Sequence, residues 1–139
     1  MKMKRLRYLL LPIVALVLEL LPYGAVCNFA NPEGEPFRET FSYFDPLPFG
    51  YANFSPLLTA LLTCVIAALL VSYLFSGSRG VARAACALSL AATVLSLCPL
   101  LYGLRYYSVV GGGISLTLLM ETAVLYVGAL KGKEPKADA

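Results

Sequence analysis

The chain has 139 residues, of which 59% are apolar and 14% are charged, and its formal net charge at pH 7 is +3. Soluble domains carry about 25% charged residues, so this composition argues against a soluble globular protein. The length allows one domain and leaves no room for a separate soluble catalytic module. The positive charges lie in short clusters beside apolar runs, and this distribution argues against nucleic acid as a partner.

Four apolar stretches follow one another along the chain, at about residues 8–26, 56–76, 84–102 and 110–130. A helix rises about 1.5 Å per residue and the hydrocarbon core of a bilayer is about 30 Å thick, so about 20 apolar residues are needed to cross it. The sequence therefore predicts an all-α integral membrane protein. We expect a single domain, residues 1–139, in which four transmembrane helices form a compact bundle within the lipid bilayer.

Lysine and arginine are concentrated on one side of the predicted topology. Nine of them lie in the N-terminal segment, in the connection between the second and third stretches, or in the tail 131–139: Lys2, Lys4, Arg5, Arg7, Arg79, Arg83, Lys131, Lys133 and Lys136. Only Arg38 and Arg105 lie in the other two connections. Cytoplasmic loops carry the excess of basic residues, so both termini are predicted to face the cytoplasm. The compact layout carries no eukaryotic sorting signal, and we expect a multi-pass protein of a bacterial plasma membrane.

The first stretch also has the basic start and apolar run of a signal peptide. Three features argue against cleavage. The run is long for a signal core, Glu19 lies inside it, and Val26 precedes Cys27 where a lipidated cysteine needs a small residue. We therefore expect this stretch to remain as a helix.

The connection 27–55 is the one long loop, and it is predicted to lie outside the cytoplasm. Its first part, Asn31 to Pro36, is rich in turn formers and is typical of a solvated tip. Its second part is aromatic, and three residues there oppose a regular helix: Pro46, Pro48 and Gly50. We expect an ordered cap at headgroup level, either as an interfacial belt without a ligand or as a platform for an extracytoplasmic partner or lipid. Its candidate contact residues are Phe41, Tyr43, Phe44, Asp45, Phe49 and Tyr51.

Small residues recur along two of the predicted helices. The second carries Ala60, Cys64, Ala68 and Ser72, and the third carries Ala85, Ser89, Ala92 and Ser96. In lipid the hydrophobic effect does not drive helices together. Small residues promote helix packing there because they allow two helix backbones to approach closely. Both stripes are therefore predicted to be helix–helix contact faces.

Two carboxyl groups, those of Glu19 and Glu121, lie deep within predicted helices. At about 1.5 Å per residue, Glu19 lies about 3 Å outward of the bilayer midplane and Glu121 about 1–2 Å inward. A charge at this depth costs at least about 2.5–3.5 kcal/mol, so both side chains are expected to face the bundle interior. The sequence does not show whether they face each other.

A carboxyl pair in this position has two interpretations. Burial and like charge both favour the neutral form, so a meeting pair is expected to share a proton or to bind a cation, with Thr117 on the same helix face as Glu121. Alternatively, each carboxyl is permanently neutral and structural, bonded to a neighbouring hydroxyl. Thr117 or Thr122 is the expected partner of Glu121, and Thr93 or Tyr23 that of Glu19.

Enzyme chemistry has little support in the sequence. The chain has no histidine, and its four cysteines form no CxxC pair, so no metal site and no cofactor are predicted. Cys27 and Cys98 lie near the outer ends of their predicted helices, where a disulfide between them is possible. Free thiols that pack as small apolar groups are favoured. No nucleophile–base pairing is evident.

The favoured function is that of a structural or accessory membrane component, assembling with itself or with a larger membrane protein through small-residue helix faces. The alternative is an oligomeric proton- or cation-coupled small transporter that uses Glu19 and Glu121. The layout resembles that of small multidrug resistance transporters, which share a first-helix glutamate, but the long loop, the second glutamate and the absence of tryptophan depart from them. The large first loop likewise resembles claudin-like tetraspan scaffolds, without their tryptophan and paired loop cysteines. Neither resemblance defines a family.

Overall fold

The computed structural model describes residues 2–50 and 53–132, which are mostly helical. Three of the described helices are long and apolar enough to cross a membrane: Ser55–Ser76, Arg79–Tyr102 and Val109–Lys131. The first is helix α4, the second joins α5 (Arg79–Leu97) to the 3₁₀ turn η2 (Cys98–Tyr102), and the third joins α6 (Val109–Val124) to the π-helical turn η4 (Leu125–Lys131). Their ranges lie close to those expected, except that α5 begins five residues earlier than residue 84.

The N-terminal helical segment differs from the expected range 8–26. It consists of α1 (Lys2–Leu6), the 3₁₀ turn η1 (Arg7–Leu9) and α2 (Leu10–Leu20). Leu21 has the extended conformation, with φ −65° and ψ 138°, which is the conformation that a following proline imposes. Pro22 therefore ends this helix, and the chain continues as a β-strand from Ala25 to Phe29 where the last part of the helix was expected.

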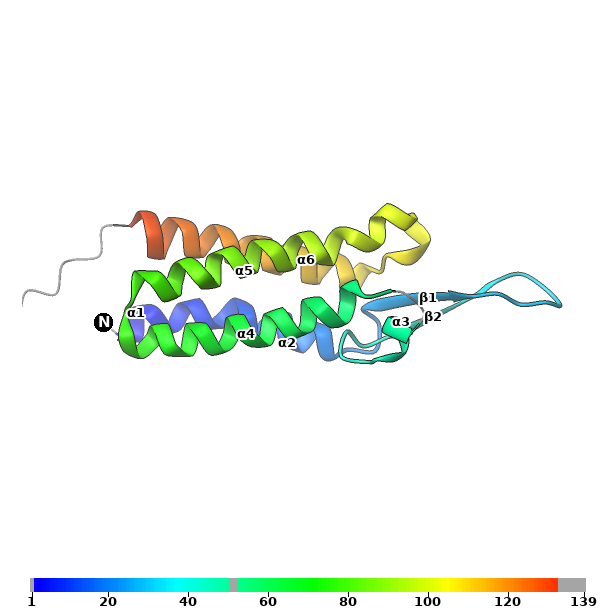
Figure 1. Ribbon diagram of the computed structural model, residues 1–139, viewed down its shortest axis with the longest axis horizontal. Coiled ribbons are helices and arrows are strands. Elements are labelled where there is room, and N and C mark those ends of the chain that lie inside the picture. Colours follow the sequence, from blue (N-terminus) through cyan, green and yellow to red (C-terminus); the bar gives the residue numbers. More distant parts are fainter. Residues whose placement is uncertain (1, 51–52, 133–139) are drawn as a thin grey trace, which may run out of the picture.

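The all-α prediction is wrong for the long connection 27–55, which contains a β-hairpin. Strand β1 (Ala25–Phe29) pairs antiparallel with β2 (Phe37–Phe41), so that Ala25 lies opposite Phe41. Between them, the side chain of Asn31 accepts a hydrogen bond from the Glu33 backbone N–H at 3.1 Å, which forms the expected turn at the tip. The short helix α3 (Leu47–Gly50) and the 3₁₀ turn η3 (Leu104–Tyr106) lie at the same end of the molecule as the hairpin (Figure 1).

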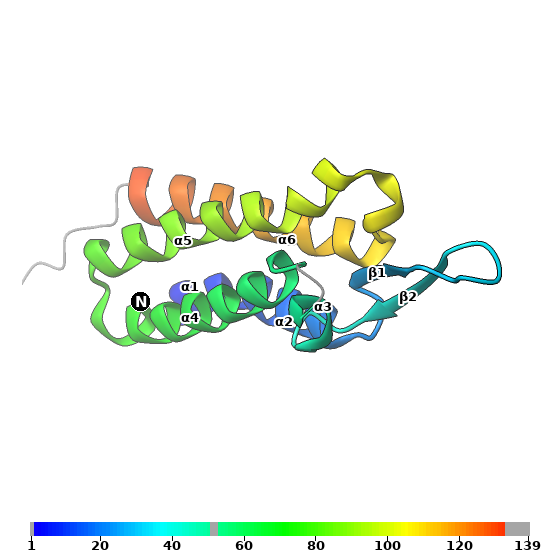
Figure 2. The same ribbon diagram turned by 45° about the vertical axis from the view of Figure 1, so that its right-hand side comes forward.

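The helices pack side by side in a ring in which α2 contacts α4, α4 contacts α5, α5 contacts α6, and α6 contacts α2. Figure 1 shows the hairpin projecting from one end of this bundle, while α1, the α4–α5 connection and η4 lie at the opposite end. The view in Figure 2 separates α2 and α4 from α5 and α6 and shows the same two ends.

Polarity is inverted relative to a soluble protein. Large apolar side chains are exposed along the whole length of the helices, among them Leu10, Val17, Leu61, Val94, Leu116 and Val127. Buried polar side chains lie inside, and we call the following set the polar core: Glu19, Thr59, Thr63, Ser89, Thr93, Ser96, Ser115, Thr117 and Glu121. Such an arrangement suits a bundle surrounded by lipid, because lipid solvates the apolar exterior and the helices pair the polar groups with one another.

Of the two small-residue faces, only one is turned inward. Ala85, Ser89, Ala92 and Ser96 are all fully buried between α5 and its neighbours. On α4, Ala60 is buried, but Cys64, Ala68 and Ser72 are exposed. The inward face of α4 is formed instead by Thr59, Thr63, Ile66, Leu70 and Tyr73.

Candidate functional site

Glu19 and Glu121 lie together inside the bundle. Glu19 is in the last turn of α2, Glu121 is in the C-terminal half of α6, and these two helices are in contact. The exposed fractions of the two side chains are 0% and 1%, and Glu121 is close enough to Glu19 to interact with it electrostatically. The contact between α2 and α6 therefore places in one interior two carboxyls that lie 102 positions apart in the sequence.

Among the described residues, one of the four carboxyl oxygens has a hydrogen-bond partner. The Thr63 hydroxyl on α4 lies 2.7 Å from Glu19 Oε1, and the same hydroxyl lies 2.9 Å from the Thr59 carbonyl. Within the described residues, Glu19 Oε2 and both oxygens of Glu121 are buried without a partner. An unpartnered buried carboxyl is costly when charged, so the site favours a bound proton or a bound cation.

Ser89 provides a further buried polar atom that has no partner among the described residues. Its hydroxyl is buried, and no hydrogen-bond partner for it occurs in the described part of the chain. Ser96 lies 2.8 Å from Ser115, and the Cys86 thiol contacts the Thr122 carbonyl at 3.7 Å, so these two contacts fix the register of α5 against α6. Since Ser89 lies two turns from Ser96, this register places it at the level of Glu121.

Several expected partners of the two carboxyls bond elsewhere. The Thr117 hydroxyl, on the expected buried face of α6, donates to the Gly113 carbonyl at 2.7 Å, and Thr122 donates to that of Leu118 at 2.9 Å. Thr93 donates to the Ser89 carbonyl at 2.8 Å, and Tyr23 is 58% exposed. Helical threonines commonly bond the carbonyl four residues back, which explains why these hydroxyls are already satisfied.

Thr63 was not among the residues singled out from the sequence. The pair Thr59 and Thr63 falls at i, i+4 within an otherwise apolar helix, and two hydroxyls at this spacing share one face. That face, together with Ile66 and Leu70, is the one that α4 turns inward. The spacing of the hydroxyls was therefore the signal for the inward face, whereas the small residues of α4 point outward.

The aromatic segment that follows β2 is bonded directly to Glu19. The backbone carbonyl of Glu19 accepts hydrogen bonds from the Tyr43 N–H at 2.9 Å and from the Ser42 hydroxyl at 3.1 Å. The Tyr43 ring is 2% exposed and fills the space beside Gly24, where a Cβ would lie 2.8 Å from the ring. Burial raises the pKa of the Tyr43 phenol well above its ordinary value, so this ring stays neutral where it covers the hairpin end of the bundle.

A chain of hydroxyl groups leads from the hairpin end of the bundle into the polar core. The Tyr107 hydroxyl lies 2.6 Å from that of Ser115, which in turn lies 2.8 Å from that of Ser96. Ser108 caps α6 by accepting from the Gly111 N–H at 2.8 Å and donates to the Gly24 carbonyl at 2.6 Å. These contacts join α5 and α6 to the cap on the outer side of the carboxyl pair.

The opposite end of the bundle is closed by two buried tyrosines. The rings of Tyr8 and Tyr73 meet edge to face with their centroids 6.0 Å apart. Arg7 donates to the Tyr8 hydroxyl at 2.9 Å, and the Arg5 guanidinium lies 5.5 Å from the centre of the Tyr73 ring. Gly128 allows the close approach of Tyr8, because a Cβ there would lie 2.5 Å from the phenol oxygen.

The other candidates of the outer loop have different surroundings. Phe41 and Phe44 are half-buried and pack against the core beside Tyr43. Asp45 accepts the Leu47 N–H at 2.9 Å, and the exposed Phe49 ring packs edge to face against that of Phe54 at 4.8 Å. Tyr51 lies outside the described residues.

All four cysteines are free thiols: Cys27 is buried, Cys64 is exposed, and Cys86 and Cys98 are half-buried. The described residues bring together no group of three or more His, Cys, Asp or Glu side chains. The interior therefore holds two carboxyls, one of them bonded to the Thr63 hydroxyl, together with the hydroxyls of the polar core. This arrangement is able to hold a proton, and its oxygen atoms are of the type that coordinates hard cations.

Comparison of the chain with protein-family models, with curated proteins and with solved structures found no match.

Proposed function

We propose that this chain is a small multi-pass membrane protein whose buried Glu19–Glu121 pair binds and exchanges a proton, as part of a proton- or cation-coupled transport activity. The observation that carries this proposal is the burial of both carboxyls with three of their four oxygens unpartnered. A purely structural carboxyl is expected to be bonded to neighbouring groups, as Glu19 is to Thr63 through one oxygen. Glu121 has no such bond within the part of the chain that the structure describes, so a proton or an ion completes the site.

The proposed topology has four spans, the first formed by the segment Lys2–Leu20, with both termini in the cytoplasm of a bacterium. The nine basic residues of the N-terminal segment, the α4–α5 connection and the tail fall on the predicted cytoplasmic side, against Arg38 and Arg105 on the outer side. In Figure 1 the N-terminal segment, the α4–α5 connection and η4 lie at one end of the bundle, which agrees with this orientation. The narrow bundle has little room for a pathway of its own, so transport requires an oligomer.

Carbodiimide labelling tests the proton-binding role, because this reagent modifies protonated carboxyls in apolar surroundings. The purified protein is expected to form an adduct at Glu121, and more slowly at Glu19, whose Oε1 is held by Thr63. The adduct is expected to decrease as the pH is raised between about 6 and 8, and an added cation that is a substrate is expected to suppress it.

Glu19→Gln and Glu121→Gln each remove one adduct site, and Glu39→Gln is the matched control because Glu39 is exposed on the hairpin. Peptide mass spectrometry locates each adduct. An absence of labelling at both buried carboxyls, or a yield that is flat across this pH range, contradicts proton exchange and supports sealed structural carboxyls.

A second candidate function, as an accessory component that assembles in the membrane, is favoured by the outward small-residue face of α4. Cys64, Ala68 and Ser72 are exposed there, so within one chain this face lacks the close helix contact that small residues allow. We propose that a second copy of the chain packs against it. In this role the protein acts through its contacts, and the carboxyl pair is structural.

Cysteine crosslinking tests this assembly. With Cys27, Cys86 and Cys98 replaced by serine, oxidation in membranes is expected to join two chains through Cys64, which is exposed on this face. Ala68→Leu is expected to lower the crosslinked fraction several-fold, because added bulk separates the helices. Val65→Leu, at an exposed neighbouring position on α4, is the control. Equal crosslinking of the two variants contradicts packing through this face.

A further inference from the structure

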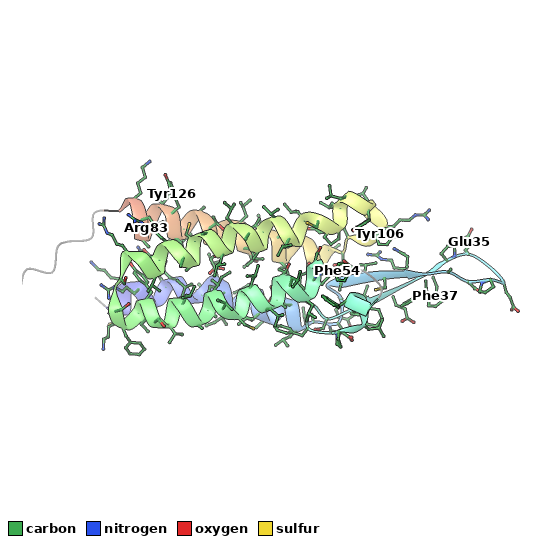
Figure 3. The ribbon with its side chains drawn as sticks, in the orientation of Figure 1. Glu35, Phe37, Phe54, Arg83, Tyr106 and Tyr126 are labelled. Atoms are coloured by element: carbon green, nitrogen blue, oxygen red, sulfur yellow. The ribbon has the colours of Figure 1, made fainter. Side chains whose placement is uncertain are left out.

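An open groove of about 620 Å³ lies between the hairpin and the corner formed by η2 and η3, on the outer side of the carboxyl pair. Asn28, Glu35 and Arg38 line it from the hairpin, and Arg105 and Tyr106 line it from the corner. Figure 3 shows Glu35 on the projecting hairpin and Tyr106 at the outer end of the helices. The hairpin and the corner are thus two separate segments that form one binding surface.

The two arginines of this groove are the two basic residues of the outer connections, and they come from positions 67 residues apart. Arg38 donates one hydrogen bond to the Tyr107 carbonyl at 3.1 Å, and Asn28 donates to the Arg105 carbonyl at 3.2 Å. These bonds hold the hairpin against the corner. No ion pair of Arg38 or Arg105 occurs within the described residues, so most of their guanidinium N–H groups are available to a ligand.

The surroundings of the groove suit the surface of a bilayer. The corner exposes Leu101 by 86%, Leu104 by 82% and Val109 by 94%. Apolar side chains this exposed, next to tyrosine and arginine, are typical of the level where the hydrocarbon core meets the headgroups. This placement rests on the proposed membrane orientation. The groove then opens at the depth of the lipid phosphates.

We propose that this groove binds a phosphate group, with Arg38 and Arg105 donating to its oxygens and Asn28 and Tyr106 lining the site. The planar guanidinium fork matches the geometry of phosphate oxygens, and paired N–H donors give bidentate contacts. Glu35 at the hairpin edge disfavours highly charged anions, which favours a phosphodiester with its single charge. Two sources carry this chemistry, the headgroup of an anionic phospholipid and a free phosphate.

Native mass spectrometry of the protein released from nanodiscs tests the proposal and separates the sources. Phosphatidylglycerol is expected to be retained in preference to phosphatidylcholine, and Arg105→Gln is expected to lower its affinity about tenfold, the effect of losing one charge-assisted hydrogen bond. Arg38→Lys keeps the charge but loses the fork, and it is expected to weaken binding less than Arg38→Gln. Arg105 has no side-chain hydrogen bond in the described structure, so its variant is expected to keep the fold, which circular dichroism checks.

Arg83→Gln is the matched control, because Arg83 is exposed at the opposite end of the bundle (Figure 3). Binding of inorganic phosphate that depends on Arg38 and Arg105, without preference between the two lipids, supports the groove as a site for a free phosphate. An equal loss of phosphatidylglycerol in Arg83→Gln and Arg105→Gln shows only general attraction to anionic lipid and overturns the proposal. Failure to bind either probe also overturns it.

Discussion

Replacement of Tyr43 by alanine is expected to lower the free energy of unfolding by about 3–5 kcal/mol, the usual cost of deleting a buried aromatic side chain. The ring is 2% exposed and packs beside Gly24 and Ile114 at the outer end of the bundle. The loop backbone that carries it is bonded to the Glu19 carbonyl, so loss of the ring leaves a cavity directly over α2. Denaturation of the protein in detergent micelles, followed by circular dichroism, measures the change.

Tyr43→Phe is the control, since it keeps the ring and removes only the hydroxyl. We expect it to change the free energy of unfolding by about 1 kcal/mol or less, the size of a single neutral hydrogen bond. An alanine variant as stable as the phenylalanine variant would show that the aromatic cap does not seal the bundle.

Replacement of Tyr73 by alanine is expected to have a similarly large effect, again about 3–5 kcal/mol, at the opposite end of the bundle. Its side chain is fully buried, its ring contacts that of Tyr8 edge to face, and the Arg5 guanidinium lies over it. Deleting the ring removes the aromatic pair and the cation–π contact together. Thermal denaturation in the same detergent measures the loss as a lowered midpoint.

Phe75 provides the matched comparison, because it lies two residues further along α4 and is 67% exposed. Phe75→Ala removes an aromatic ring of similar size from the outside of the helix, and we expect a change within about 0.5 kcal/mol. Comparable destabilisation by Phe75→Ala and Tyr73→Ala would show that burial in this bundle does not determine the cost.

Buried tyrosines lie on both sides of the carboxyl pair along the bundle. Tyr43 closes the outer side, Tyr8 and Tyr73 close the other side, and Glu19 and Glu121 lie between them. In the proposed transport role, a proton that enters or leaves the pair passes these tyrosines or the connected hydroxyl groups of Tyr107, Ser115 and Ser96. Opening and closing of these layers is the motion that a transport role requires.

The sequence predicted the helices most accurately where a stretch is both apolar and long. The apolar stretches 56–76 and 110–130 lie within one residue of their helices, because a long apolar run has few other stable structures in a membrane. The first helix was placed too far along the chain. Its true end depends on the extended conformation that Pro22 imposes on Leu21.

The hairpin could not be derived from the loop composition. Strand β1 has the sequence AVCNF and β2 has FRETF, five residues each, and their burial follows no strict alternation. Their pairing depends on the turn at Asn31 and on the contacts of Asn28 and Arg38 with the corner after α5, which are long-range. Short strands that depend on contacts with residues far away in the sequence leave only a weak local signal.

The candidate site was only partly accessible from the sequence. The rarity of carboxyls in apolar stretches singled out Glu19 and Glu121, and their cost in lipid indicated that they face inward. Their meeting depends on the rotation of α2 against α6, and the bond from Thr63 depends on the rotation of α4. Small residues promote contact with a helix of the same chain or of another chain, so the stripe from Ala60 to Ser72 did not define that rotation.

Infrared absorption of the protonated carboxyl groups, recorded with the protein reconstituted in lipid, tests the central claim most directly. We expect a carboxyl C=O band that weakens as the pH is raised and shifts when water is replaced by D₂O, because the buried pair exchanges protons with solvent. Glu19→Gln and Glu121→Gln should each remove part of this band, and Glu39→Gln should leave it unchanged. A band that neither responds to pH nor exchanges in D₂O, or no band from these two residues, would contradict a proton-exchanging pair.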